Sequence, residues 1–360
     1  MAKASKHKSA LKEQDGVSQQ ETTNTSSIKA IKQKRKSQPT ANDLVAEILK
    51  GNITALSRAI TLIESKNTSH LEKANTIIKA CLPHANQSIR IGITGVPGVG
   101  KSTFIEAFGK HLTAQNKKVA VLAIDPSSSL TKGSILGDKT RMEDLVKDKN
   151  AFIRPSPSGE SLGGVARKTR ETIILCEAAG FDTIIIETVG VGQSETAVHS
   201  MVDFFLLLKL AGAGDELQGI KRGIIEMADA IAINKADGDN LKKAKLAKVE
   251  FNRALHLYPK KESSWNPKVI LCSALHNDGI DDIWKIIEEY IVLTSESGYL
   301  NQKRKDQNAF WLIQTIEEQL KGAFFNDSKI KEELQKQIQL IEADKTTPFA
   351  AADYLLSLNK

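Results

Sequence analysis

The sequence has little of several things, and each shortage excludes a class of protein. Three cysteines, Cys81, Cys176 and Cys272, lie far apart in the 360 residues, which excludes a disulfide framework and a cysteine metal site. We therefore expect a reducing compartment, the cytoplasm. No apolar run approaches the ~18 residues of a membrane-spanning helix, so no membrane association is expected. Aromatic residues make up only 5%, but hydrophobic residues reach 41%, which excludes disorder throughout the chain.

Charge is placed unevenly along the chain. Residues 1–40 carry nine lysines and arginines but three acids, and so hold nearly all of the net charge of +7. They are also poor in apolar residues, so burial cannot offset the entropy cost of ordering them, and we expect a disordered basic tail. The remaining chain is nearly neutral, and no nucleic-acid partner is expected.

Apolar spacing divides the rest of the chain into three parts. Residues 41–85 have helical spacing and predict an N-terminal helical segment. Residues 86–295 alternate short apolar strands with helices, which predicts an α/β fold with a doubly wound, mostly parallel sheet. The expected strands are Arg90–Thr94, Lys118–Ile124, Thr183–Glu187, Phe204–Leu210, Ala230–Asn234 and Val269–Ser273.

Residues 296–360 are charged and predict a C-terminal helical arm. A break at residues 326–328 separates two of its helices, and a short helix is expected around residues 354–358. Such an arm can pack on its own domain or against a second copy of the chain. Its apolar stripe comprises Phe310, Ile313, Ile316, Leu320, Leu334, Ile338 and Ile341.

A glycine-rich loop follows the first expected strand. Positions 95–103 read GVPGVGKST, which matches the G-x-x-x-x-G-K-[ST] phosphate-binding pattern between a strand and a helix. Glycines let main-chain N–H groups turn toward phosphate oxygens, and the following helix adds its positive N-terminus. We expect Lys101 to reach the β- and γ-phosphates and the Ser102 hydroxyl to bind Mg²⁺. The expected nucleotide-binding residues here are Gly95, Gly98, Val99, Gly100, Lys101, Ser102 and Thr103.

A second loop indicates which base is bound. Positions 234–237, Asn-Lys-Ala-Asp, match the N-K-x-D pattern of guanine recognition. The Asp237 carboxylate can accept hydrogen bonds from guanine N1–H and N2–H₂, whereas adenine offers no such donor pair. We expect Lys235 to lie over the base plane, Asn234 to brace the loop, and GTP and GDP to be the nucleotides. A downstream S-A loop, whose main-chain N–H usually meets guanine O6, comprises Ser273, Ala274 and Leu275.

Acids at strand ends complete the expected site. Glu187 ends an apolar strand and would hold Mg²⁺, directly or through water, while the Gly190 N–H would meet the γ-phosphate. Asp125, at the end of another strand, is a second expected metal ligand, and Asp138 lies in a glycine-bounded segment that can move with nucleotide state.

One expected group is missing from this region. Ras-like enzymes have a water-orienting glutamine directly after the switch II glycine, where this chain has Val191. We therefore expect hydrolysis that is slow without a partner.

Four segments together resemble the MeaB/ArgK family of P-loop GTPases, which is similar to the human methylmalonic aciduria type A protein. They read DPSS, GSILGDKTRM, ETVGVGQSE and NKAD, and the resemblance covers roughly residues 41–345. It implies a P-loop NTPase fold with N-terminal helices and a C-terminal dimerisation arm. It also implies a chaperone that gates adenosylcobalamin delivery to methylmalonyl-CoA mutase, or a related cobalamin-dependent acyl-CoA mutase, and protects it. The basic tail departs from the family pattern.

The resemblance also implies roles for individual residues. Asp125, Asp138 and Glu187 would be the metal and switch acids. Residues 211–221 would form a third switch that responds to the mutase, with Asp215 and Lys221 completing the catalytic site in the complex. The expected catalytic residues are Lys101, Asp138, Glu187, Gly190 and Lys221.

Two other functions remain open at this point. A nickel metallochaperone of the same P-loop branch would need a Cys/His cluster, and only Cys81 and His84 lie close in the sequence. A phosphotransferase acting on a protein would use the same loops, but would leave the γ-phosphate on its partner.

Overall fold

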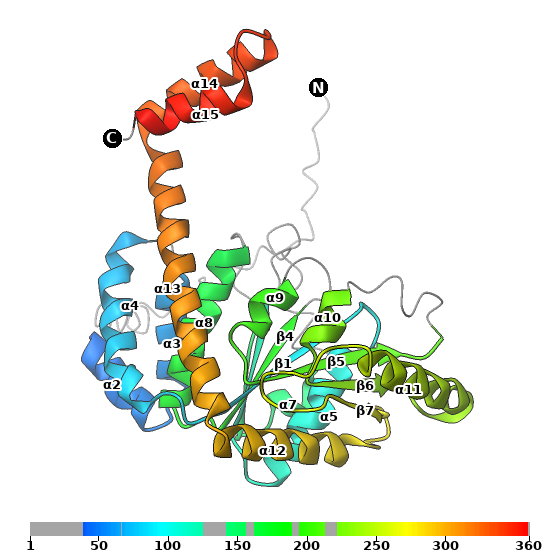
Figure 1. Ribbon diagram of the computed structural model, residues 1–360. Helices are drawn as coiled ribbons and strands as arrows, with labels where there is room; N and C mark the ends of the chain where they lie inside the picture. Colours follow the sequence, from blue (N-terminus) through cyan, green and yellow to red (C-terminus); the bar gives the residue numbers. More distant parts are fainter. Residues whose placement is uncertain are drawn as a thin grey trace, which may run out of the picture. The chain divides into compact units, whose positions relative to one another are not determined.

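Seven parallel strands form the sheet at the centre of the chain (Figure 1). The computed structural model describes residues 39–65, 67–124, 142–155, 162–188, 194–212 and 222–358, and the fold below is that of the unit Ala41–Lys360. The order across the sheet is β3-β2-β4-β1-β5-β6-β7. The strands are β1 (Ile89–Gly95), β2 (Val119–Ile124), β3 (Ala151–Arg154), β4 (Thr183–Thr188), β5 (Phe204–Leu210), β6 (Ala230–Asn234) and β7 (Lys268–Leu271).

The central strands are apolar on both faces because helices cover both sides of the sheet. In β1, Ile91 pairs in parallel register with Ile185 of β4 and with Phe204 of β5, and all three side chains are buried. The doubly wound α/β fold expected from the sequence is confirmed.

Two details of the strand prediction are wrong. Strand β3 was not expected, because it is a four-residue edge strand in which only Phe152 is buried, so its apolar periodicity is weak. The last strand begins at Lys268, one residue earlier than expected, and ends at Leu271, two residues earlier than expected. Ser273 instead forms an isolated bridge with Asp278, which closes the turn after the strand.

Helices flank the sheet and form both ends of the unit. Asn52 caps helix α3 (Ile53–Glu64), since its side chain accepts from the N–H groups of Thr54 and Ala55 at 2.9 and 3.1 Å. The helices are α2 (Ala41–Leu49), α3 (Ile53–Glu64), α4 (Thr68–Cys81), α5 (Lys101–Ala114), α7 (Glu143–Val146), α8 (Leu162–Ala178), α9 (Ser194–His199), α10 (Arg222–Met227), α11 (Leu241–Leu255), α12 (Ile280–Glu296), α13 (Tyr299–Asn326), α14 (Ser328–Glu342) and α15 (Pro348–Ser357), with 3₁₀ turns at Leu82–His84 and Gly238–Asn240.

The core lies on both faces of the sheet. One face packs on α5, α7 and α12 through a cluster that includes Phe104, Phe108 and Trp284. The other face packs on α2, α3, α4, α8 and α9 over β1, β2 and β4, and on α10 and α11 over β5, β6 and β7. No helix in the described ranges is both long enough and apolar enough to cross a membrane.

The first half of α13 is fastened to the sheet at the amino ends of β1 and β5. Arg304 donates to both carboxylate oxygens of Asp203 and to the main-chain oxygens of Asn86 and Ser88, at 2.6–2.8 Å. Further along the helix, Gln307 donates to the Val202 carbonyl. We call this set of contacts the arm root; its donors are Lys303, Arg304, Gln307 and Trp311.

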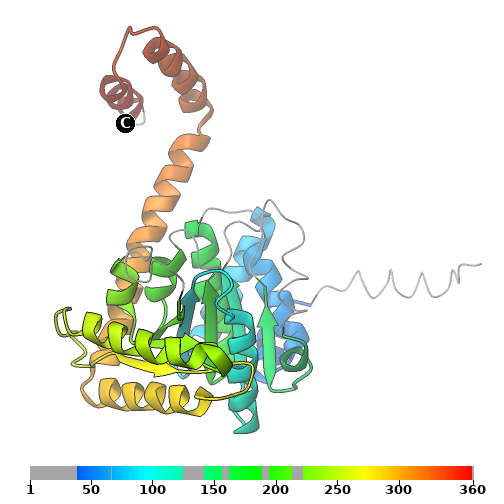
Figure 2. The ribbon, with the colours of Figure 1, turned by 90° about the vertical axis from the view of Figure 1, so that its right-hand side faces the viewer.

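Beyond the root, α13 leads to α14 and α15, which Figures 1 and 2 show away from the sheet. Asp327 caps α14 by accepting from the Ile330 N–H at 3.1 Å, at the expected break. Apolar side chains of the expected stripe in α13 are 45–66% exposed: Phe310, Ile313, Ile316 and Leu320.

Candidate nucleotide site

The phosphate loop lies between β1 and α5, at the carboxyl edge of the sheet. Gly95 and Gly100 both have positive φ angles, 155° and 92°. A Cβ at Gly95 would lie 2.6 Å from the Leu208 carbonyl oxygen, and one at Gly100 would lie 2.9 Å from Asn234 Nδ2. Glycine is required at both positions because this segment packs closely on β5 and on the end of β6.

Lys101 begins α5 and is 9% exposed. Its Nζ donates to the carbonyl oxygens of Gly95 at 2.8 Å and Val96 at 3.4 Å, so the ammonium lies within the loop. Burial lowers the pKa of Lys101, and the charges of Glu187 and Glu195 oppose that shift. The loop therefore holds a partly desolvated cation, which strengthens its attraction for phosphate.

Asn234, at the end of β6, ties two other loops together. Its Nδ2 donates to the Val99 carbonyl at 2.9 Å, and its Oδ1 accepts from the Ala274 N–H at 3.1 Å. The side chain is 1% exposed, so both bonds are shielded from water. The P-loop, the N-K-x-D loop and the S-A loop are thereby held as one unit.

The other base-loop residues reinforce this arrangement. Lys235 has a φ of 57°, and its Nζ donates to the Gly98 carbonyl at 3.0 Å. The Ser273 hydroxyl donates to the Asp237 carboxylate, which orients the group expected to accept from guanine. Leu275 is 74% exposed at the mouth of this loop.

Glu187 lies in β4 beside the phosphate loop. It is 8% exposed and pairs in register with Ile93 of β1, and its charge acts on Lys101. Its carboxylate and the Ser102 hydroxyl are hard oxygen donors at the same edge of the sheet, which is the ligand chemistry that Mg²⁺ prefers. These two residues therefore fit a magnesium ion bound with phosphates.

Several expected residues cannot be placed. Asp125, Asp138, Gly190 and Lys221 lie outside the described residues, as do Val191 and Asp215. The other expected site residues are brought to one edge of the sheet: Gly95, Gly98, Val99, Gly100, Lys101, Ser102, Thr103, Glu187, Asn234, Lys235, Asp237, Ser273, Ala274 and Leu275.

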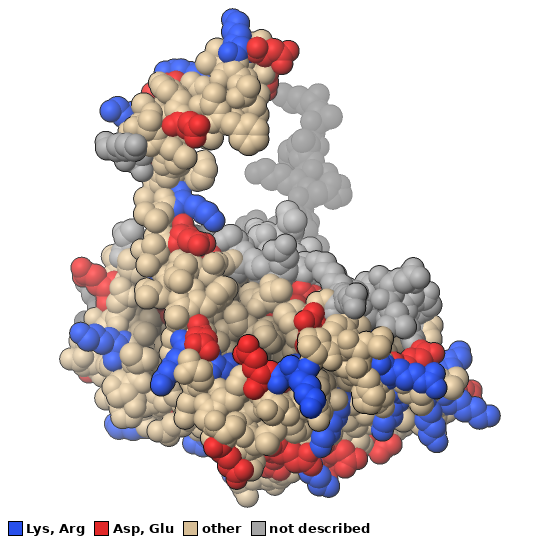
Figure 3. Space-filling view, in the orientation of Figure 1, with Lys and Arg blue, Asp and Glu red and all other residues tan. Residues whose placement is uncertain are grey.

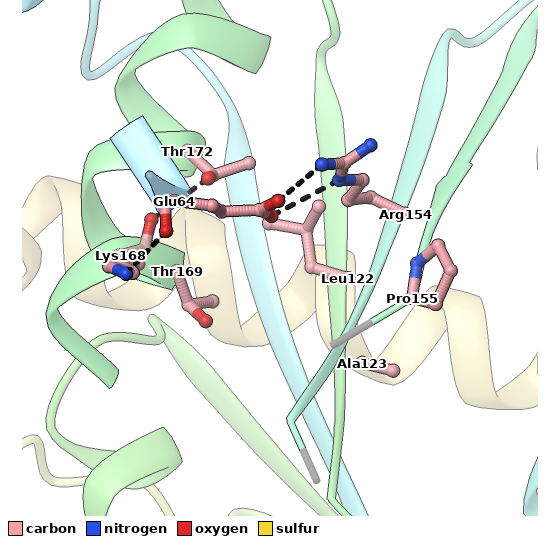
Figure 4. Close-up of a pocket in the computed structure, with 8 residues that line it drawn as sticks. All are labelled: Glu64, Leu122, Ala123, Arg154, Pro155, Lys168, Thr169 and Thr172. Atoms are coloured by element: carbon pink, nitrogen blue, oxygen red, sulfur yellow. Dashed lines mark hydrogen bonds and ion pairs between the residues drawn. The ribbon is translucent and has the colours of Figure 1, made fainter. Parts of the chain in front are cut away.

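Sequence reasoning missed two features of this edge. Glu195, in the first turn of α9, is 5% exposed, and its charge raises the pKa of Lys101. In the sequence, the only indication of this role was the position of Glu195 at the end of the ETVGVGQSE segment. Near the ends of β2 and β3, Glu64 of α3 pairs with Arg154, with Nε–Oε1 at 3.1 Å, and its carbonyl accepts from Lys168 (Figure 4). These partners are 90 and 104 residues apart, and no local pattern joins them.

Surface charge is mixed over much of the visible face. Figure 3 shows acids and bases interspersed near α12, with basic side chains more frequent near α11. That helix carries five basic residues and one acid: Lys242, Lys243, Lys245, Lys248, Arg253 and Glu250. Among the described residues, no group of three or more His, Cys, Asp or Glu side chains is placed to hold a metal ion.

The parallel sheet, the P-loop before α5 and the loops after β6 and β7 define a P-loop GTPase. Residues 56–329 match the family described as "Methylmalonyl Co-A mutase-associated GTPase MeaB". The chain belongs to this MeaB family, as its sequence resemblance indicated.

Similar proteins agree with this assignment. The chain is 48% identical to GTPase ArgK of Escherichia coli over 289 residues, which cover 80% of this chain and 87% of ArgK. It is 44% identical to the methylmalonic aciduria type A homolog, mitochondrial, of Mus musculus, over 90% of this chain and 81% of that protein. A crystal structure titled LAO/AO transport system kinase superposes with a TM-score of 0.73 and 37% identity, covering 89% of this chain and 98% of that one.

Proposed function

We propose that this GTPase is a chaperone of methylmalonyl-CoA mutase, or of a related cobalamin-dependent acyl-CoA mutase, and that it gates adenosylcobalamin delivery and protects the mutase. The observation that carries the proposal is the match of residues 56–329 to a family described as associated with that mutase. The relative in Mus musculus, whose name refers to methylmalonic aciduria, supports the same partner.

In the proposed mechanism, each loop has one task. Asp237, oriented by Ser273, accepts hydrogen bonds from guanine, and Lys235 covers the base. Lys101 and the main-chain N–H groups of the P-loop bind phosphate oxygens. Magnesium, held by Ser102 and Glu187 and by Asp125, would neutralise charge on the phosphates.

Hydrolysis is proposed to be slow in the isolated protein and faster with the mutase. Val191 stands where Ras-like enzymes have a water-orienting glutamine, and Asp215 and Lys221 are the residues proposed to complete the catalytic site in the complex, beside the expected switch residues Asp138 and Gly190. Groups supplied by a partner are worth ~10³–10⁵ in rate in comparable GTPases.

A second copy of the chain is the proposed partner of the C-terminal arm, residues 296–360. The stripe that includes Ile313, Ile316 and Leu320 is about half exposed or more, and a contiguous exposed apolar surface marks an interface. Sedimentation velocity should give a dimer for the wild type and a monomer for a double variant, Ile316→Asp with Leu320→Asp. The matched double variant Lys321→Asp with Lys331→Asp should remain dimeric. A wild-type monomer at 50 μM would contradict the proposal.

The cytoplasm is the proposed location. The three cysteine thiols are buried and unpaired with one another, and burial raises the pKa of Cys81 to about 11, so these thiols are unreactive in a reducing compartment.

The direct experiment measures GTP turnover with purified mutase. We expect the turnover rate to rise at least tenfold when mutase is added, and adenosylcobalamin transfer to depend on GTP. An unrelated acyl-CoA enzyme serves as the control. If neither protein changes the activity of the other, the chaperone assignment is wrong.

A second candidate function follows from the similar crystal structure that is titled a kinase. With γ-labelled GTP, a phosphotransferase would leave label on a protein, whereas a GTPase releases free phosphate. The nickel alternative has no supporting observation in the described ranges. Equilibrium dialysis that finds stoichiometric nickel bound tightly would restore it.

A further inference from the structure

A cavity of about 390 Å³ lies at the amino edge of the sheet, opposite the P-loop. Its walls come from the ends of α9 and α10, from residues between α11 and β7, and from the first turns of α13. Sites for small molecules in proteins have volumes of roughly 300–1,000 Å³, so the cavity is large enough for one. None of the residues that line this cavity belongs to the nucleotide site described above.

One ion pair in the cavity wall is already complete. Asp229 accepts from Lys261 at 2.7 Å through one carboxylate oxygen and from the Phe205 N–H at 2.9 Å through the other. Lys261 also donates to the carbonyl oxygens of Met227 and Ala228. A lysine ammonium has three donors, and Lys261 uses all three here, so it has none left for a ligand.

Lys303 of α13 brings a second ammonium to the same wall. Its Nζ donates to the Asp203 main-chain carbonyl at 2.7 Å, a neutral group, because the Asp203 carboxylate is bound by Arg304. The same ammonium lies 6.0 Å from the centre of the Tyr290 ring, which is also uncharged. Burial lowers the pKa of Lys303, although the carboxylates of Asp229 and Asp203 partly oppose that shift. An anion in the cavity would compensate this desolvated charge.

The other polar groups limit what kind of anion fits. Burial, together with Lys303, lowers the pKa of His199 to about 4, so its ring is neutral at pH 7 and offers hydrogen bonds without charge. Glu226 and Glu262 are exposed lining residues and would repel a polyanion. Ile225, which is 2% exposed, gives the cavity an apolar wall.

We propose that this cavity binds a small monocarboxylate with an apolar or aromatic body, whose carboxylate pairs with Lys303 and hydrogen bonds to His199. The cavity is therefore a second ligand site, separate from the nucleotide site and independent of the mutase assignment.

The position of the cavity connects it to the nucleotide edge. Helix α9 begins at Ser194, four residues after Gly190, which is expected to meet the γ-phosphate, and ends at His199 in the cavity. Helix α10 follows the expected third switch, and its Ile225 and Glu226 also line the cavity. Each short helix thus follows a segment expected to respond to the nucleotide and contributes residues to the cavity, and we expect ligand occupancy to be coupled to nucleotide binding.

Benzoate is the test probe, with benzamide as its neutral isostere. Titration of the full-length protein by calorimetry should detect benzoate binding in the millimolar range or tighter, and benzamide at least tenfold more weakly. Inorganic phosphate should also bind at least tenfold more weakly than benzoate. Equal affinity for benzoate and benzamide, or no benzoate binding at 20 mM, would overturn the site.

Two lysine variants locate the binding. Lys303→Met should weaken benzoate at least tenfold, whereas Lys260→Met, which removes an equal charge at the exposed rim, should change it less than twofold. Circular dichroism checks that both variants fold. If Lys303→Met does not fold, wild-type crystals soaked in benzoate decide, since density beside Lys303 is expected and density elsewhere alone would refute the site.

Coupling is measured by GTP affinity with and without saturating benzoate. We expect a change of at least threefold, and the same factor in benzoate affinity when GTP is saturating, because linkage is reciprocal. An unchanged GTP affinity would overturn the coupling while leaving the binding site in place. Lys303→Met should abolish the effect.

Discussion

The two edges of the sheet use charged side chains in opposite ways. At the carboxyl edge, Lys101 and Asp237 are held by the loops themselves, so their charges remain directed at the place where a ligand binds. At the amino edge, Arg304 meets the buried carboxylate of Asp203 and two main-chain carbonyls. There the protein itself compensates the cation, and the contact holds α13 against the sheet.

Lys101 and Asp237 are therefore expected to serve ligand recognition, whereas Arg304 serves the stability of the fold. We expect Lys101 and Asp237 at the nucleotide edge to contribute to ligand affinity and little to folding. At the arm root, Arg304 contributes to folding, because its removal leaves the buried Asp203 carboxylate without a compensating charge. Substituting residues at each edge in turn, and measuring both GTP affinity and the free energy of unfolding, tests this comparison.

The largest expected effect is on nucleotide affinity, from Lys101→Ala. Loss of this ammonium should weaken GTP about a thousandfold, ~4 kcal/mol, as for other buried charge pairs that lose one partner. The free energy of unfolding should change by less than ~1 kcal/mol, because burial already disfavours the charged form. Fluorescent GTP titration and urea unfolding measure the two quantities. Lys110→Ala, an exposed position on the same helix, is the control, and a loss of affinity there would break the comparison.

The next effect falls on stability, from Arg304→Met at the arm root. The Asp203 side chain is fully buried, so it would lose its compensating charge, and we expect destabilisation of ~3 kcal/mol. GTP affinity should stay within threefold. Urea unfolding checks this, with exposed Lys305→Met as the matched control. A stable Arg304→Met protein with poor GTP affinity would reverse the roles assigned to the two edges.

Asp237→Asn tests base recognition at the carboxyl edge. Replacing the carboxylate should weaken GTP about 100-fold, ~2.7 kcal/mol, and strengthen binding of xanthosine triphosphate, whose base offers an acceptor where guanine has a donor. Competition titrations with both nucleotides measure the change. Exposed Asp239→Asn should behave as wild type, and unchanged GTP affinity in Asp237→Asn would refute the guanine assignment.

The smallest effect is a pH dependence at the amino edge. Burial alone would raise the pKa of Asp203, but hydrogen bonds and charge from Arg304, with help from Arg90, hold it below its usual value. A pKa lowered by folding stabilises the protein above the unfolded value of ~3.9, and the stabilisation declines as pH falls through the folded value.

The stability difference between wild type and Arg304→Met should therefore narrow by ~1 kcal/mol between pH 5 and pH 3. Urea unfolding across this range measures it, and Lys305→Met should follow the wild type. If the difference in the free energy of unfolding between wild type and Arg304→Met stays constant from pH 5 to pH 3, ionisation of Asp203 does not contribute to the stability of the arm root.

Local patterns were sufficient where one short segment makes the structure. The G-x-x-x-x-G-K-[ST] spacing predicted a strand, a loop and a helix start, and the structure has all three at Ile89–Gly95 and Lys101. Strand β3 was missed because an edge strand of four residues buries too little to produce a pattern. The break before α14 was predictable because the capping residue, Asp327, acts only three residues ahead.

Contacts between distant segments could not be predicted in the same way. Asn234 contacts Val99, 135 residues away in the sequence, and Arg304 contacts Asp203, 101 residues away. Neither contact produces a periodic pattern in the sequence. The cavity at the amino edge depends on at least four segments that only the folded chain brings together.

By itself the sequence determined the class of fold, the phosphate loop and the guanine preference, because short-range spacing of glycine, lysine and carboxylate decides local backbone shape and ligand chemistry. Tertiary structure alone decided that Asn234 joins three loops, that Arg304 fastens the arm, and that Lys303 faces a cavity. The physical reason is that burial and charge compensation depend on which groups meet after folding, whatever their distance along the chain.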